Sequence, residues 1–97
     1  MKEFKNQHDL FEHIWNTHEH VSEINGDPLL PKTHWKWIWQ FAHVLCKKTY
    51  PYYKLKEENI MLMLPEQHEH QEQYDVYNEK KLELTQQYYK EFYSKEY

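Results

Sequence analysis

Three polar residues in the middle of the chain, His43, Asn59 and His68, could together carry out proton transfer and metal chemistry. Fifteen residues separate His43 from Asn59, and eight more separate Asn59 from His68. A neutral imidazole can draw a proton from water, and a second imidazole can bind a divalent cation that polarises a phosphate. Each histidine alone would be typical of a surface or core-edge residue, so the order of the three residues carries the hypothesis.

The elements around these residues predict a compact ββα unit. Residues 34–44 alternate between aromatic and other side chains, which predicts a strand, although Trp35, Trp39 and Ala42 also fit a helical period. A loop follows at 46–58, and a short apolar run at 59–64 predicts a second strand. Pro65 suits the first turn of a helix, which would carry His68. Strand, loop, strand and helix would aim both imidazoles at one phosphate.

Two further helices are expected to flank this unit. Residues 3–16 place Phe4, Phe11, Ile14 and Trp15 at helical spacing. A final helix over 78–93 is expected to pack through Leu82, Tyr89, Phe92 and Tyr93. Between the first helix and the ββα unit, the Asn-Gly pair at 25–26 predicts a tight turn between short extended arms.

The composition limits the class of protein. The 97 residues predict one domain spanning 1–97, and 17 aromatic residues (four Trp, nine Tyr, four Phe) argue against disorder. A single cysteine excludes an intramolecular disulfide framework. No apolar run reaches the roughly 18 residues of a membrane span, and the N-terminal residues lack a signal-peptide core, so we expect a cytoplasmic protein without a membrane partner.

Charge is distributed unevenly along the chain. The net charge is −4, yet residues 28–56 contain six lysines and no acidic residue, while 1–27 and 57–97 carry −4 and −6. Such a basic, aromatic-rich segment is typical of a phosphate-facing surface, although lysines and acids could instead pair across the fold. The chain has no arginine, so lysines would contact phosphates as point charges.

Residues 41–70, FAHVLCKKTYPYYKLKEENIMLMLPEQHEH, resemble the HNH endonucleases of the ββα-metal superfamily, particularly small phage-encoded members. The resemblance implies an α+β domain with a ββα-metal core, about 20–73, between N-terminal and C-terminal helices. It implies that His43 is the general base, that Asn59 pins the loop and orients that base, and that His68 binds a divalent metal such as Mg, Mn, Ni or Zn.

Two departures from the family pattern concern the metals. HVSEINGDPL, residues 20–29, looks like the first zinc-knuckle turn, but the four knuckle positions hold Ser22, Asn25, Leu64 and Gln67. None of these is a thiolate, so we expect no structural zinc. Many members also carry a metal-binding Asp before the general base. Ala42 stands there, and His34, Glu69 or His70 would have to compensate.

Two functions follow from the resemblance. The first is a metal-dependent DNA endonuclease without sequence preference, whose expected DNA-binding residues are Lys47, Lys48, Tyr50, Lys54 and Lys56. The second is a catalytically inactive phage protein of the same fold that binds a host protein or nucleic acid, as an inhibitor of host defence or a virion component. In a third interpretation the ββα pattern is a coincidence.

The aromatic residues outside the proposed site are expected to support the fold. Trp35, Trp37 and Trp39 are predicted to pack between the N-terminal helix and the sheet, with base stacking as the alternative. The C-terminal tyrosines predict helix packing or the self-association face of a homodimer; they are Tyr88, Tyr89, Tyr93 and Tyr97.

Overall fold

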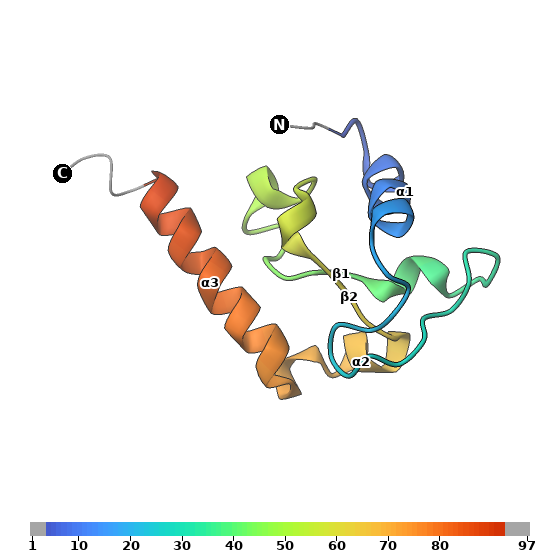
Figure 1. Cartoon of the computed structure of the whole chain (residues 1–97). Coiled ribbons are helices and arrows are strands. Elements are labelled where there is room, and N and C mark those ends of the chain that lie inside the picture. The colour runs from blue at the N-terminus through green and yellow to red at the C-terminus, as the bar shows by residue number, and fades with distance from the viewer. Residues whose placement is uncertain (1–3, 93–97) are drawn as a thin grey trace.

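The computed structural model describes residues 4–92 and shows a small α+β domain with three α-helices and a two-stranded antiparallel sheet within that range (Figure 1). Short 3-10 helices η1 to η4 connect these elements. Their bounds are α1 Gln7–Thr17, η1 Trp37–Gln40, β1 Phe41–His43, η2 Pro51–Tyr53, η3 Glu57–Asn59, β2 Ile60–Leu62, α2 Pro65–Glu69, η4 Gln71–Gln73 and α3 Asp75–Phe92. No helix in this range is long and apolar enough to cross a membrane.

The sheet separates two hydrophobic clusters. Phe41, Ile60 and Leu62 pack with the buried face of α1, a cluster that we call the α1 core. Ala42 and Met61 belong instead to a cluster with Tyr77 and Leu84 of α3, which we call the α3 core. The alternation follows from the strand period, because neighbouring side chains point to opposite faces. Figure 1 shows the two strands between α1 and α3.

The first helix begins later than its hydrophobic pattern predicts. Asn6 caps it, since Asn6 Oδ1 accepts a hydrogen bond from the Asp9 N–H at 2.9 Å, and the helix then runs from Gln7 to Thr17. Phe4 lies outside the helix and packs against the α1 core. The predicted contact face is otherwise present, because Phe11, Ile14 and Trp15 are buried.

The long strand predicted over 34–44 is wrong except at its end. Only Phe41–His43 pair with β2, and Trp37–Gln40 form the 3-10 helix η1. The pairing cannot continue from Phe41 toward residue 34, because the opposite strand β2 is soon followed by α2, which begins at Pro65. The buried Gln40 side chain instead joins the end of η1 to the preceding segment: its Oε1 accepts the Leu30 N–H at 2.6 Å, and its Nε2 donates to Leu30 O at 3.2 Å.

The last helix begins earlier than predicted and packs through a different face. It starts at Asp75, and Tyr77, Leu84 and Tyr88 lie against the α3 core. Leu82 and Tyr89, expected on the packed face, are 60% and 53% exposed. The inward residues follow spacings of seven and four, which keeps them on one side of the helix. Tyr93 and Tyr97 lie outside the described residues.

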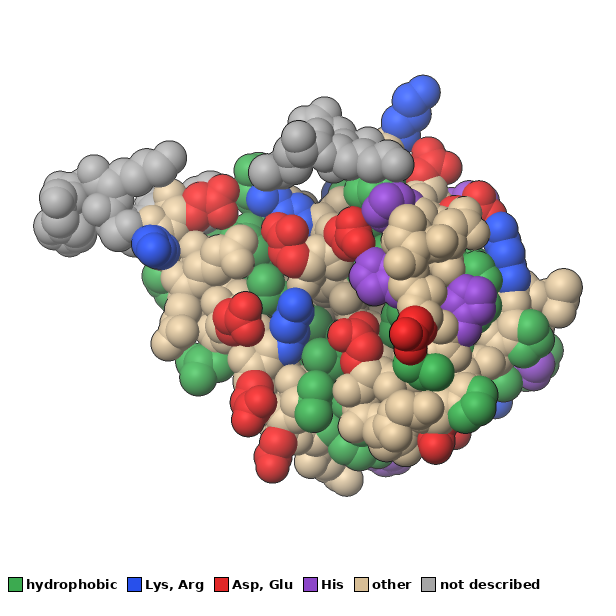
Figure 2. Space-filling view, viewed as in Figure 1, with side chains coloured by type: hydrophobic (Ala, Val, Ile, Leu, Met, Phe, Trp, Pro, Cys, Tyr) green, Lys and Arg blue, Asp and Glu red, His purple; other side chains and the backbone are tan. Residues whose placement is uncertain are grey.

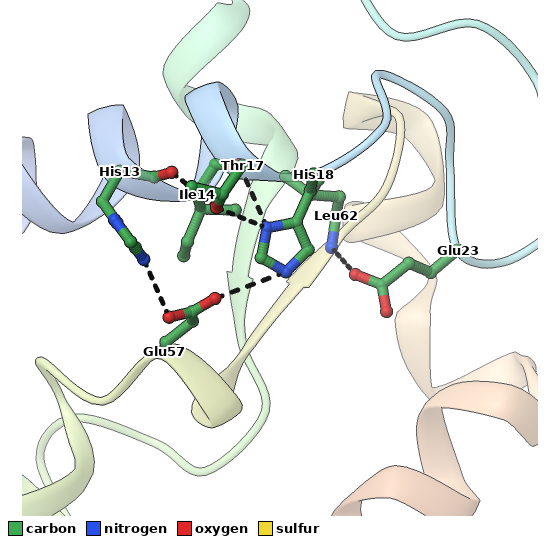
Figure 3. A network of polar contacts seen from close by, with 7 residues as sticks. All are labelled: His13, Ile14, Thr17, His18, Glu23, Glu57 and Leu62. Atoms are coloured by element: carbon green, nitrogen blue, oxygen red, sulfur yellow. Dashed lines mark hydrogen bonds and ion pairs between the residues drawn. The ribbon is translucent and has the colours of Figure 1, made fainter. Parts of the chain in front are cut away.

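The Asn-Gly turn forms as predicted and docks on the sheet. Gly26 has φ +81°, a left-handed conformation that favours glycine, and Val21 and Pro28 pair across the turn. Glu23 then joins the turn to β2, because its N–H donates to Leu62 O at 2.8 Å. Its carboxylate also accepts the Leu62 N–H at 2.7 Å (Figure 3). The turn thus supplies hydrogen-bond partners for the Leu62 N–H and carbonyl, on the edge of β2 that does not pair with β1.

Candidate functional site

A cleft of about 510 Å³ brings His43 and His68 together. It lies beside α1, η1, β1 and α2, and we call it the histidine cleft. Its polar and reactive lining side chains include His43, His68, Lys47, Cys46 and Gln71. The sequence predicted that the two histidines would face one site, and the fold places both along the same opening.

His43 is held so that one ring nitrogen is available as a base. It is the last residue of β1, it is half-buried, and its Nε2 lies 3.0 Å from the backbone oxygen of Lys54. A carbonyl oxygen only accepts, so Nε2 carries the hydrogen and, in the neutral ring, Nδ1 carries the lone pair. Burial lowers the pKa of His43, and the positive charges of Lys47 and His68 lower it further against the opposing bond to Lys54.

Asn59 anchors the loop that contains Lys54, the residue whose backbone carbonyl binds His43. Its side chain is fully buried; Oδ1 accepts the Leu45 N–H at 2.7 Å, and Nδ2 donates to Leu45 O at 3.1 Å and to Tyr53 O at 3.2 Å. Tyr53 directly precedes Lys54, whose carbonyl orients the imidazole. Asn59 therefore lies outside the cleft and acts on His43 through the backbone.

His68 has the complementary arrangement. It lies in α2, and its Nδ1 is 2.9 Å from the backbone oxygen of Trp39. By the same reasoning Nδ1 donates, which leaves the Nε2 lone pair free in the neutral ring. A metal-binding histidine usually has its second nitrogen oriented in this way by a carbonyl or carboxylate.

The position before His43 supplies no ligand to the cleft. Ala42 is fully buried in the α3 core, on the face of the sheet opposite to His43. A carboxylate at that position would be enclosed among apolar side chains, which is costly. Within residues 4–92 no three His, Cys, Asp or Glu side chains are grouped to hold a metal ion.

Gln71 supplies a polar atom that sequence reasoning missed. Its Oε1 is buried without a hydrogen-bond partner in the described structure, and the residue lines the histidine cleft. An amide oxygen is a suitable ligand for a hard divalent cation, and a buried one without a partner is rare. Gln67, Gln71 and Gln73 stand in one polar run, so no spacing in the sequence distinguishes Gln71.

The residues predicted to contact DNA divide into two groups. Lys47 lines the cleft, and a neighbouring pocket of about 310 Å³ is lined by Lys5, Lys47 and Lys54. Lys48 is exposed. By contrast, the Lys56 ammonium lies 4.4 Å from the Tyr52 ring and 3.9 Å from Glu58. The ring of the half-buried Tyr50 packs 5.0 Å from that of Tyr88.

Three of the four knuckle positions meet through hydrogen bonds. The buried Ser22 Oγ donates to Gln67 Oε1 at 2.6 Å, and the same oxygen accepts the Leu64 N–H at 2.9 Å. Ser22 Oγ also accepts the Ile24 N–H at 3.1 Å. Asn25 instead bonds within its own turn to Asp27. We call the Ser22–Gln67 contact the knuckle clasp, since it joins the turn to α2.

Loss of the knuckle clasp is expected to destabilise the domain measurably. Ser22→Ala removes a partner from the buried Gln67 oxygen and the Ile24 N–H, which should lower the free energy of unfolding by about 1–2 kcal/mol. Urea denaturation measures this change. Asn25→Ala, at an exposed position of the same turn, should cost clearly less. Equal effects of the two substitutions would contradict a stabilising role for the clasp.

A separate polar cluster attaches α1 to η3. His13 Nε2 lies 3.0 Å from Glu57 Oε1, and His18 Nε2 lies 3.5 Å from Glu57 Oε2, so the carboxylate stands between the two rings (Figure 3). Figure 2 shows histidine side chains gathered beside α1 on this face. The cluster fixes α1 to the segment just before Asn59 and lies outside the histidine cleft.

No family model matches the chain, and comparison with curated proteins and with solved structures likewise found no match. A function must therefore be inferred from the geometry of the chain's own residues.

Proposed function

We propose that this chain is a small metal-dependent endonuclease of the HNH type, with His43 as the general base. One observation carries the proposal: two imidazoles line one cleft, and a backbone carbonyl holds each of them through one nitrogen. The available lone pairs are therefore on His43 Nδ1 and His68 Nε2. This pair offers a base and a metal ligand at a single opening.

The chain's own residues would divide the work of hydrolysis. His43, neutral because its pKa is lowered, would take a proton from the water that attacks the phosphorus. Lys47 and Lys54 would hold phosphate oxygens of the DNA strand, on the side of the cleft next to α1. Asn59 would keep the loop, and with it the Lys54 carbonyl, in place behind the imidazole.

The residues of the cleft fit a divalent cation held by few protein ligands. His68 Nε2 would hold it, and Gln71, which lines the same cleft, would supply an amide oxygen, with water and phosphate oxygens as the remaining ligands. When bound, a divalent cation polarises the scissile phosphate and stabilises the leaving oxygen. One imidazole and one amide oxygen suit Mn²⁺ and Ni²⁺ better than Mg²⁺, because Mg²⁺ strongly favours carboxylate oxygens and water.

Metal dependence provides the first test. Wild-type protein is expected to nick supercoiled plasmid in Mn²⁺ or Ni²⁺ and to be inactive in excess EDTA. His68→Ala should raise the Mn²⁺ concentration required for half-maximal rate at least ten-fold, in keeping with the effect of removing support from a metal site. His8→Ala is the matched control, since His8 is an exposed histidine on α1.

Two outcomes of that assay would contradict the proposal. One is the absence of nicking by wild-type protein in each of Mg²⁺, Mn²⁺ and Ni²⁺. The other is a Mn²⁺ requirement that His68→Ala leaves unchanged.

A non-catalytic binding protein of the same fold is the second candidate. The exposed carboxylates that follow β2 favour it, because they could face a basic protein; they are Glu66, Glu69, Glu72, Asp75 and Glu79. Acidic side chains are scattered over the α3 side of the face shown in Figure 2. This candidate predicts binding to a host protein that EDTA does not affect, together with the absence of metal-dependent cleavage.

A further inference from the structure

An aromatic groove adjoins the histidine cleft. Its volume is about 330 Å³, and it shares Trp39 and His68 with the cleft; Lys36, Pro65, Glu66 and Glu69 complete its lining. Beside it, Trp35 is 70% exposed and Trp39 is 48% exposed, and their ring centroids are 5.2 Å apart at 77°. Exposed tryptophans grouped at a groove are typical of a binding surface.

These tryptophans contradict the prediction that all three pack inside. Only Trp37 is buried, where it meets Trp15 and Phe41 edge to face. Where the sequence predicts a strand, η1 turns Trp37 and Gln40 toward the interior, whereas Trp39 within η1 and Trp35 before it are exposed. A small domain gains stability by burying large aromatic side chains, so the exposure of this pair points to a ligand.

The charges around the groove distinguish a base from a phosphate. The Lys36 ammonium lies 5.1 Å from the Trp35 ring and 5.9 Å from the Trp39 ring, which places a cation beside two aromatic faces. Glu66 and Glu69 line the groove with Pro65. Carboxylates repel a phosphate but accept hydrogen bonds from the amino and imino groups of bases. The groove therefore matches a nucleobase, and the lysine-lined side of the cleft matches the backbone.

We propose that the aromatic groove binds an unpaired nucleobase, stacked on Trp39, next to the phosphate in the histidine cleft. The substrate class is then single-stranded DNA or a locally unpaired segment of a duplex; its position relative to the scissile phosphate rests on the proposed function. Aromatic side chains stack on any base whose face is free, whereas a paired base must first leave its stack. Duplex DNA should therefore bind less well than a single strand.

Binding in EDTA tests this inference separately from cleavage. Fluorescence anisotropy would compare a labelled 12-nucleotide single strand with a hairpin duplex of the same base composition. We expect the single strand to bind at least ten-fold more tightly. Trp39→Ala should weaken that binding on the order of ten-fold, Trp39→Phe should retain most of it, and Tyr89→Ala, an exposed aromatic on α3, should leave it unchanged. Trp39→Ala keeps the backbone oxygen that orients His68.

Equal affinity for the two DNAs, or single-strand binding that Trp39→Ala leaves unchanged, would overturn the inference. Loss of a dimer in sedimentation velocity upon Trp39→Ala, without a change in DNA binding, would also overturn it by assigning the groove to self-association. The two proposals can fail separately. Single-strand binding without metal-dependent cleavage would contradict only the proposed function, and duplex nicking without single-strand preference would contradict only the present inference.

Discussion

Replacement of His43 by alanine is expected to slow Mn²⁺-dependent cleavage about 10²–10⁴-fold, the range typical of a lost general base. The fold should survive, because the ring is half-buried and makes one hydrogen bond, to the carbonyl of the exposed residue Lys54. Single-turnover cleavage of an end-labelled oligonucleotide measures the rate. The unfolding midpoint of each variant verifies that it is folded.

The pH dependence of cleavage distinguishes a base from a merely structural histidine. The pKa of His43 is lowered from 6.5, chiefly by burial and then by the Lys47 charge, so the acidic limb of the rate profile should lie below pH 6.5. Lys47→Gln removes one positive charge and should move that limb toward higher pH. Lys48→Gln, at the adjacent exposed residue, should move it less.

The same shift affects stability with a defined sign. Because the folded state holds the proton of His43 more weakly than the unfolded state, the unfolded state gains stability as the pH falls below 6.5. His43→Ala should therefore flatten part of the loss of stability in mild acid.

A cleavage rate unaffected by His43→Ala, or an acidic limb above pH 6.5 in the wild type, would contradict the assignment of His43 as base.

Asn59→Ala is expected to cause the largest loss of stability, about 3–5 kcal/mol. The substitution leaves three backbone groups, the Leu45 N–H, the Leu45 carbonyl and the Tyr53 carbonyl, without their partner in a site with no exposure. Each buried group left unpaired costs about 1–3 kcal/mol, and partial hydration of the loop offsets some of the sum. Equilibrium denaturation in urea measures the change.

Two other substitutions sharpen the interpretation of that result. Asn59→Asp keeps an acceptor for the Leu45 N–H but turns a carboxylate toward two carbonyl oxygens, so it should be no less destabilising than alanine. Asn78→Ala removes one exposed hydrogen bond to Glu72 and should cost below about 1 kcal/mol. An Asn59→Ala variant as stable as Asn78→Ala would refute the role of Asn59 as the anchor of the loop.

Local rules in the sequence predicted the elements whose conformation depends on a few neighbouring residues. Gly26 takes the positive φ that an Asn-Gly turn favours, and Pro65 occupies the first turn of α2. The apolar run from Ile60 forms β2, which pairs with β1 and is buried on one face by the α1 core and on the other by the α3 core. The α+β class followed from these elements.

Tertiary contacts decided the elements that the sequence did not predict. The alternation at 34–44 suits a strand, but only a partner strand of matching length could stabilise it, and β2 spans three residues. The Gln40 side chain bonds to Leu30, a contact that no local pattern predicts. Trp35 and Trp39 thereby became surface residues.

The candidate site was predictable in its histidines and not in its supporting atoms. The spacing of His43 and His68 on a β-hairpin and the following helix indicated that they would share one opening. The tautomers depend on the carbonyls of Lys54 and Trp39, and the unpartnered oxygen of Gln71 depends on how η4 packs. Such contacts depend on backbone geometry, which residue types alone do not specify.

The most direct test of the central claim is an anomalous difference map from crystals soaked in MnCl₂. The predicted result is a single strong peak in the histidine cleft, within bonding distance of His68 Nε2 and on the side of Gln71 Oε1. His68→Ala crystals treated identically should lose it. A cleft without a peak, at a Mn²⁺ concentration that supports cleavage in solution, would contradict the claim that these residues form the metal centre of a nuclease.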